Sequence, residues 1–145
     1  MSGGEGAPEG IERRRTEGGD FRARVLVVDD DQVDRMAVRR NLARAPGEIV
    51  VEEAEGVLDA IGRLTGEPFD CVVLDYNLPD GDGLTFLRGL RSAGLDVPVV
   101  MLTGQEDAGV ARALLRSGAA AYLPKAGLSA DVLLATIRDA VRGRA

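Results

Sequence analysis

Residues 70–83 read DCVVLDYNLPDGDG, an apolar run that ends on Asp75 and is followed at once by a loop rich in Pro, Gly and Asp. A buried charge without a partner costs several kcal/mol or shifts its pKa until it is neutral. An aspartate at the tip of a buried strand therefore either lies at an exposed strand end or belongs to a site. The rest of the chain decides between these two interpretations.

Other short apolar runs flank this one and alternate with helical patterns. Runs of this kind are typical of strands that are buried on both faces. The expected strands cover residues 23–28, 48–54, 69–75, 97–103 and 120–125, and the expected helices cover 31–45, 57–64, 83–92, 105–117 and a last segment that Ser129 caps. Five repeats of strand and helix predict a parallel sheet covered by helices on both sides.

The first and last helices differ in the strength of their apolar faces. At helical spacing the first places together Val33, Met36, Ala37, Arg40 and either Ala43 or Arg44, a face whose apolar part is modest. The last helix has a stronger apolar face, formed by Val132, Leu133, Leu134, Ile137 and Val141.

Composition narrows the class of protein. The chain has 145 residues, which fits one domain, and its net charge of −6 argues against broad binding to nucleic acid. It has no histidine, which excludes His-based catalysis, His metal ligands and histidine phosphorylation on this chain. The single cysteine, Cys71, indicates a chain without a disulfide framework and a cytoplasmic location.

The N-terminal segment has a different composition from the rest. Residues 1–21 are rich in Gly and charge, without the apolar region of a secretory signal, and we expect a disordered tail there. No apolar stretch reaches the roughly 20 residues of a membrane span. One domain is then expected over residues 22–145.

Polar residues stand at the carboxyl ends of the expected strands: Asp29 and Asp30 after the first, Asp75 after the third, Thr103 after the fourth and Lys125 after the fifth. Ligands of open α/β sheets bind at this edge, where the strand order reverses. In a flavodoxin-like order of 2-1-3-4-5, the first and third strands are neighbours, so the three aspartates meet in one small region.

Such a cluster predicts a particular chemistry. Three carboxylates repel one another unless a cation or protons are present, and oxygen ligands suit Mg²⁺. Lys125 adds positive charge and Thr103 adds a hydroxyl, groups that can neutralise a phosphoryl group. Asp75 is then interpreted as a nucleophile that forms an acyl phosphate, which explains its place at a strand tip.

Four motifs, VLVVDDD, CVVLDYNLPDGDGL, VVMLTG and AYLPK, follow one another at fitting separations. With them, nearly the whole chain after residue 22 resembles the CheY-like receiver domain of bacterial response regulators in two-component signalling. The resemblance implies a flavodoxin-like (βα)5 three-layer sandwich. It also implies that Asp75 is the phosphoacceptor, that Asp30 and Asp75 bind Mg²⁺ directly with the backbone carbonyl of Asn77, and that Asp29 helps through water.

By the same resemblance, Thr103 and Lys125 contact the phosphoryl oxygens, and Tyr122 is an aromatic switch that turns inward when Thr103 moves. A packing role for Tyr122 stays open. The chain departs from the family after Lys125, where Ala126 replaces the usual proline. A cis bond before a residue other than proline costs about 3 kcal/mol, so a trans bond is expected.

We expect a stand-alone response regulator, not an enzyme in its own right, that receives a phosphoryl group from a histidine kinase or a histidine phosphotransfer protein. Its output would be protein contact through a face around 105–117, Tyr122 and 131–142, as a monomer or a phosphorylation-dependent dimer, without nucleic acid or membrane. A phosphate-independent binding module and a receiver fragment of a larger kinase or cyclase are alternatives. A dehalogenase-type phosphohydrolase fits poorly, because Asn77 stands where such enzymes carry a second acid.

Overall fold

The computed structural model describes residues 21–45, 47–104 and 108–144. The expected tail, apart from Phe21, and the first three residues of the expected helix 105–117 lie outside this part of the chain. Phe21 itself is fully buried in the core. No helix in the described residues is both long and apolar enough to cross a bilayer.

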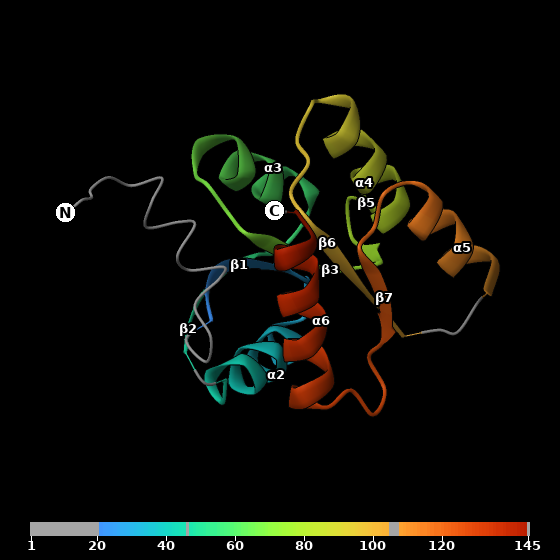
Figure 1. Ribbon diagram of the computed structural model, residues 1–145. Coiled ribbons are helices and arrows are strands. Elements are labelled where there is room, and N and C mark those ends of the chain that lie inside the picture. Colours follow the sequence, from blue (N-terminus) through green and yellow to red (C-terminus); the bar gives the residue numbers. More distant parts are fainter. Residues whose placement is uncertain (1–20, 46, 105–107, 145) are drawn as a thin grey trace.

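Strands and helices alternate as predicted (Figure 1). In chain order they are β1 (Arg22–Val28), α2 (Gln32–Ala43), β2 (Glu48–Ala54), α3 (Val57–Gly66), β3 (Cys71–Asp75), β4 (Asn77–Leu78), β5 (Gly81–Asp82), α4 (Gly83–Ser92), β6 (Val99–Thr103), α5 (Ala108–Arg116), β7 (Ala121–Pro124) and α6 (Ala130–Arg144). The short pair β4 and β5 lies in the segment that was expected to be a plain loop.

The central sheet has the strand order β2-β1-β3-β6-β7, and every pairing in it is parallel. Numbering only these five strands gives 2-1-3-4-5, so the predicted flavodoxin-like order is confirmed. The order reverses between β1 and β3, which are neighbours. The carboxyl ends of these two strands therefore lie side by side.

Alternate residues of the strands point to opposite faces of the sheet and build two apolar layers. Leu26, Val72, Val99 and Met101 face one layer, which includes buried side chains of α3, α4 and α5. Val25, Cys71, Val73 and Val100 face the other, which includes buried side chains of α2 and α6 (Figure 1). The result is the expected sandwich of helices, sheet and helices.

The predicted face of α2 is wrong. Val33 and Met36 are 71% and 47% exposed, and the buried residues are Arg35, Val38 and Leu42. Val38 and Leu42 are one helical turn apart and form a narrow apolar stripe. Arg35 is buried on the same face, because an acidic side chain pairs with its charge. For α6, four of the five predicted residues are buried, whereas Val132 is 49% exposed.

Candidate functional site

Backbone hydrogen bonds carry the sheet pattern past the ends of the strands and fix the site residues. The Asp29 amide donates to the carbonyl of Ala54 at 3.1 Å, and the Lys125 amide donates to the carbonyl of Thr103 at 2.8 Å. The Tyr76 amide, just after Asp75, donates to Leu102 at 2.8 Å. Asp29, Asp75 and Lys125, at the ends of β1, β3 and β7, are thus held at one edge of the sheet.

The three predicted aspartates come together at this edge. Oxygen atoms of Asp29, Asp30 and Asp75 all lie within 4.8 Å of one another. Asp29 and Asp75 are only 3% and 6% exposed, whereas Asp30 is exposed. Two buried carboxylates beside an accessible one form an oxygen-only donor set that suits a hard divalent cation.

Backbone amides orient the two buried carboxylates. The amide of Asp31 donates to Asp29 Oδ1 at 2.9 Å, and the amide of Asn77 donates to Asp75 Oδ1 at 3.3 Å. Each amide belongs to the residue two positions further along the chain, so each loop turns back toward its own strand end. These contacts fix one oxygen of each carboxylate.

Lys125 lies among three carboxylates. Its Nζ is 2.9 Å from Asp29 Oδ2, 3.4 Å from Asp75 Oδ2 and 2.7 Å from Asp34 Oδ2. The sequence predicted the proximity to Asp29 and Asp75, but not the role of Asp34, which lies in the first turn of α2. Its only sequence signal is its position four residues after Asp30.

These charges shift two pKa values. Burial, together with the nearby charge of Asp29, raises the pKa of Asp75 to about 6, although Lys125 opposes this shift. Burial lowers the pKa of Lys125, but its hydrogen bonds to Asp34 and Asp29 outweigh burial and raise that pKa above its usual value. The lysine therefore stays charged. The ionised form of Asp75 is less favourable here than it would be in water.

The remaining predicted residues line the same edge or lie near it. Thr103 is the last residue of β6, is 3% exposed and is paired in register with Pro124. Asn77 is exposed and begins β4. Tyr122 is half-buried and packs against the apolar layer of α3, α4 and α5, next to Met101 in the strand register.

The trans bond expected after Lys125 is confirmed, and Asp31 caps the helix beside the site. Asp31 is exposed and caps α2, because its carboxylate accepts hydrogen bonds from the amides of Val33 and Asp34. Within the described residues no peptide bond is cis, so the Lys125–Ala126 bond is trans.

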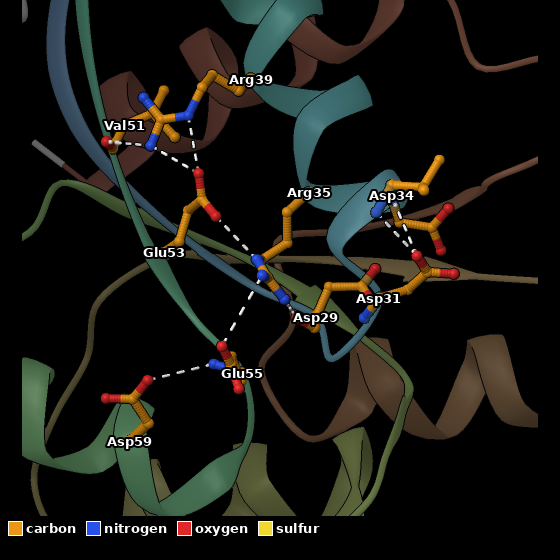
Figure 2. A network of polar contacts seen from close by, with 10 residues as sticks. Asp29, Asp31, Asp34, Arg35, Arg39, Val51, Glu53, Glu55 and Asp59 are labelled. Carbon is orange, nitrogen blue, oxygen red and sulfur yellow. Dashed lines mark hydrogen bonds and ion pairs between the residues drawn. The ribbon is translucent and has the colours of Figure 1, made fainter.

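The buried Arg35 links the site to β2 (Figure 2). Its Nη1 donates to the backbone carbonyl of Asp29 at 2.7 Å, and its Nε donates to Glu53 at 2.8 Å. Glu55 lies 3.9 Å from its Nη2, and Arg39 also binds Glu53. The hydrogen bond from Arg35 lowers the pKa of Glu53, which keeps this network charged. Arg35 thus holds the backbone of the first aspartate loop.

Replacing Arg35 by methionine is expected to destabilise the protein by about 2 kcal/mol, because the carbonyl of Asp29 and the carboxylate of Glu53 lose a charged donor. Urea unfolding measures this change. The matched variant Arg39→Met removes a half-exposed arginine from the same glutamate and should cost no more than about 0.5 kcal/mol. Equal losses in the two variants would contradict a special role for Arg35.

The loop after Asp75 is anchored at both ends. The carboxylate of Asp80 accepts hydrogen bonds from the amides of Val57 and Leu58 at 2.8 and 3.2 Å, at the start of α3. The Gly83 amide donates to the carbonyl of Tyr76 at 2.6 Å. A Cβ on Gly83 would lie 2.7 Å from the sulfur of Met101, so any other residue there would require the Met101 side chain to shift.

Comparison with known proteins gives a consistent set of matches. The family model described as response regulator receiver domain matches residues 25–138. Over 119 residues the chain is 39% identical to Response regulator MprA of Mycobacterium sp. (strain KMS) and 38% identical to that of Mycobacterium ulcerans (strain Agy99). Both alignments cover 82% of this chain but 50% of the relative, so the chain spans about half the length of these curated relatives.

Solved structures show the same fold. The chain is 28% identical to a LuxR-family two-component response regulator from Aurantimonas sp., with a TM-score of 0.77 over 83% of this chain and 86% of that one. A Francisella response regulator receiver domain is 24% identical, with a TM-score of 0.77 over 85% of this chain and 99% of that one. The second likeness supports the fold alone.

Proposed function

Since the chain belongs to the response regulator receiver domain family, we propose that it is a Mg²⁺-dependent phosphoacceptor switch with Asp75 as the acceptor. The observation that carries this proposal is the position of Asp75, which is buried at a strand end beside two other carboxylates and 3.4 Å from Lys125. A buried carboxylate with a raised pKa in a polar cluster is typical of a functional site.

In the proposed reaction an oxygen of Asp75 attacks the phosphorus of a donor phosphohistidine. A P–O bond forms, the P–N bond breaks, and the leaving imidazole nitrogen keeps the electron pair. Lys125 and the hydroxyl of Thr103 donate to the oxygens of the transferred phosphoryl group, which carries negative charge that they neutralise.

The metal would be held by Asp30, Asp75 and the backbone carbonyl of Asn77, with Asp29 acting through water. Mg²⁺ supplies charge neutralisation between the carboxylates and the phosphoryl oxygens. The oxygen-only donor set supports this choice, as does the raised pKa of Asp75, which reflects burial first and then repulsion by Asp29.

The proposed switch runs from Thr103 to Tyr122. Thr103 ends β6 and Tyr122 lies on the adjacent β7, half-buried against the layer that contains α5. A shift of Thr103 toward a phosphoryl group would open space that the ring of Tyr122 can enter. The output surface would then include α5, β7 and α6. Residues 105–107, which were also expected in this surface, lie outside the described residues.

The proposed donor is a histidine kinase or a histidine phosphotransfer protein, in the cytoplasm. Because the curated relatives are about twice as long as the matched region, a receiver segment of a larger response regulator is a second candidate beside a stand-alone regulator. The proposed domain covers residues 22–145. In either case the chain acts as a phosphoacceptor rather than as a classical enzyme.

Beryllofluoride, which mimics an aspartyl phosphate, tests the proposal by amide NMR. We expect shifts that require Mg²⁺ and that extend from Asp75 through Thr103 to Tyr122 and α6. Beryllofluoride without Mg²⁺ is the control and should leave the spectrum unchanged. A wild-type spectrum that does not respond in the presence of both would contradict the proposed switch and favour the phosphate-independent binding module.

A further inference from the structure

The strongest unassigned feature is the contact between Lys125 and Asp34, and its interpretation rests on the proposed function. Asp34 Oδ2 is the nearest of the three carboxylate oxygens to Nζ, at 2.7 Å, and Asp75 Oδ2 is the farthest, at 3.4 Å. The contact joins residues 91 positions apart, from the first turn of α2 to the end of β7. The lysine thus lies toward α2 rather than toward the acceptor.

The number of donors on Lys125 limits what it can bind. An ammonium group has three N–H donors, and here three carboxylates surround it. A phosphoryl group on Asp75 adds further oxygen acceptors at the same place. One of the present contacts must therefore weaken when the phosphoryl group is bound.

The three carboxylates differ in what they lose when the lysine moves. The side chain of Asp29 is 5% exposed and belongs to the carboxylate cluster, so it has little water to replace the lysine. Asp75 is itself modified in the reaction. The side chain of Asp34 is 38% exposed, so water can solvate it at small cost. The contact with Asp34 is the one that breaks most easily.

The surroundings leave room for this movement. A cavity of about 110 Å³ lies beside the pair, lined by Asp34, Lys125 and apolar side chains that include Val38, Leu102 and Leu128. Lys125 is therefore not enclosed by packed side chains on the side that faces α2. We infer that Asp34 is a positioning residue that competes with the phosphoryl group for Lys125 and so weakens the phosphorylated state.

Beryllofluoride affinity in the presence of Mg²⁺ tests this inference on the full chain. Asp34→Asn keeps the shape but removes the charge, and we expect affinity to rise about fivefold, the upper range for a partly exposed ion pair. Asp34→Glu restores a carboxylate within reach of the lysine and should return the affinity to near the wild-type value. Urea unfolding verifies that each variant is folded.

The control is Asp31→Asn. Asp31 caps the same helix, and asparagine caps a helix as well as aspartate does, so this variant removes one nearby charge and keeps the structure. We expect Asp31→Asn to raise the beryllofluoride affinity only slightly. An equal rise in Asp31→Asn and Asp34→Asn would show a general effect of charge and overturn the inference.

The ammonium ¹⁵N resonance of Lys125 gives a direct readout. In the wild type we expect it to shift when beryllofluoride binds, and in Asp34→Asn we expect part of that shift before any addition. A wild type that binds beryllofluoride while Asp34→Asn changes neither affinity nor resonance overturns this inference alone. A wild type that does not bind overturns the proposed function and this inference with it.

Discussion

Asp75→Asn is expected to abolish covalent phosphorylation. An amide oxygen is a far weaker nucleophile than a carboxylate, and the proposed reaction needs the oxygen that lies 3.4 Å from Lys125. Intact-protein mass spectrometry after incubation with Mg²⁺ and acetyl phosphate measures the result directly. The wild type should gain one phosphoryl group and the variant none.

Asp82→Asn is the matched control for this experiment. Asp82 is exposed in the same loop and caps α4 through the amide of Thr85, a role that asparagine can keep. This variant should be phosphorylated at the wild-type rate. Labelling of Asp75→Asn at a rate near that of the wild type would contradict the assignment of Asp75 as acceptor.

The metal-free protein is expected to lose stability as the pH rises from about 4.5 to about 7. Asp75 has a pKa of about 6 in the folded protein, against about 3.9 when unfolded, so in this range the unfolded chain releases its proton first. The loss is at most about 3 kcal/mol, the equivalent of a shift of about two pKa units. The loss of stability is complete once the pH exceeds the pKa of Asp75 in the folded protein.

The other pKa shifts in the described part of the chain act outside this range. The chain has no histidine, so no imidazole contributes. The pKa values of Glu52, Glu53 and Asp80 are lowered, so their contributions are lost only at more acidic pH. The raised pKa of Lys125 affects stability only in alkaline solution. Of these groups, Asp75 is the one that changes stability between these limits.

Urea unfolding in EDTA at several pH values measures this slope. Asp75→Asn should flatten it and should be more stable than the wild type at pH 7, because the repulsion with Asp29 is absent. Mg²⁺ should restore stability to the wild type at neutral pH, because it binds the ionised form. An equal slope in wild type and Asp75→Asn would contradict the raised pKa.

The sequence was sufficient to predict the order of strands and the meeting of the aspartates. Both follow from patterns that are local and strong: continuous apolar runs, and polar residues at the point where each run ends. The five-strand order is confirmed, and Asp29, Asp30 and Asp75 lie together. The functional roles of these residues stay predictions.

The sequence was insufficient where a side chain is buried because of partners far away in the chain. The face of α2 was misplaced because Arg35 reads as a surface residue, and only the acidic groups of β2 and the carbonyl of Asp29 make its burial favourable. Asp34 was missed for a similar reason, since its partner is 91 positions away. The pair β4 and β5 has only two residues in each strand, too few for a periodic pattern.

The anchoring of the loop at Asp80 has an entropic consequence. Ordering a free loop costs about 1–2 kcal/mol per residue, a penalty that would weaken any ligand bound through it. Here Asp80 ties the loop to α3, and the pairing of Asn77 with Asp82 fixes its two sides before a ligand arrives. The carbonyl of Asn77 is therefore preorganised, and ligand binding at this edge need not wait for a disorder-to-order transition.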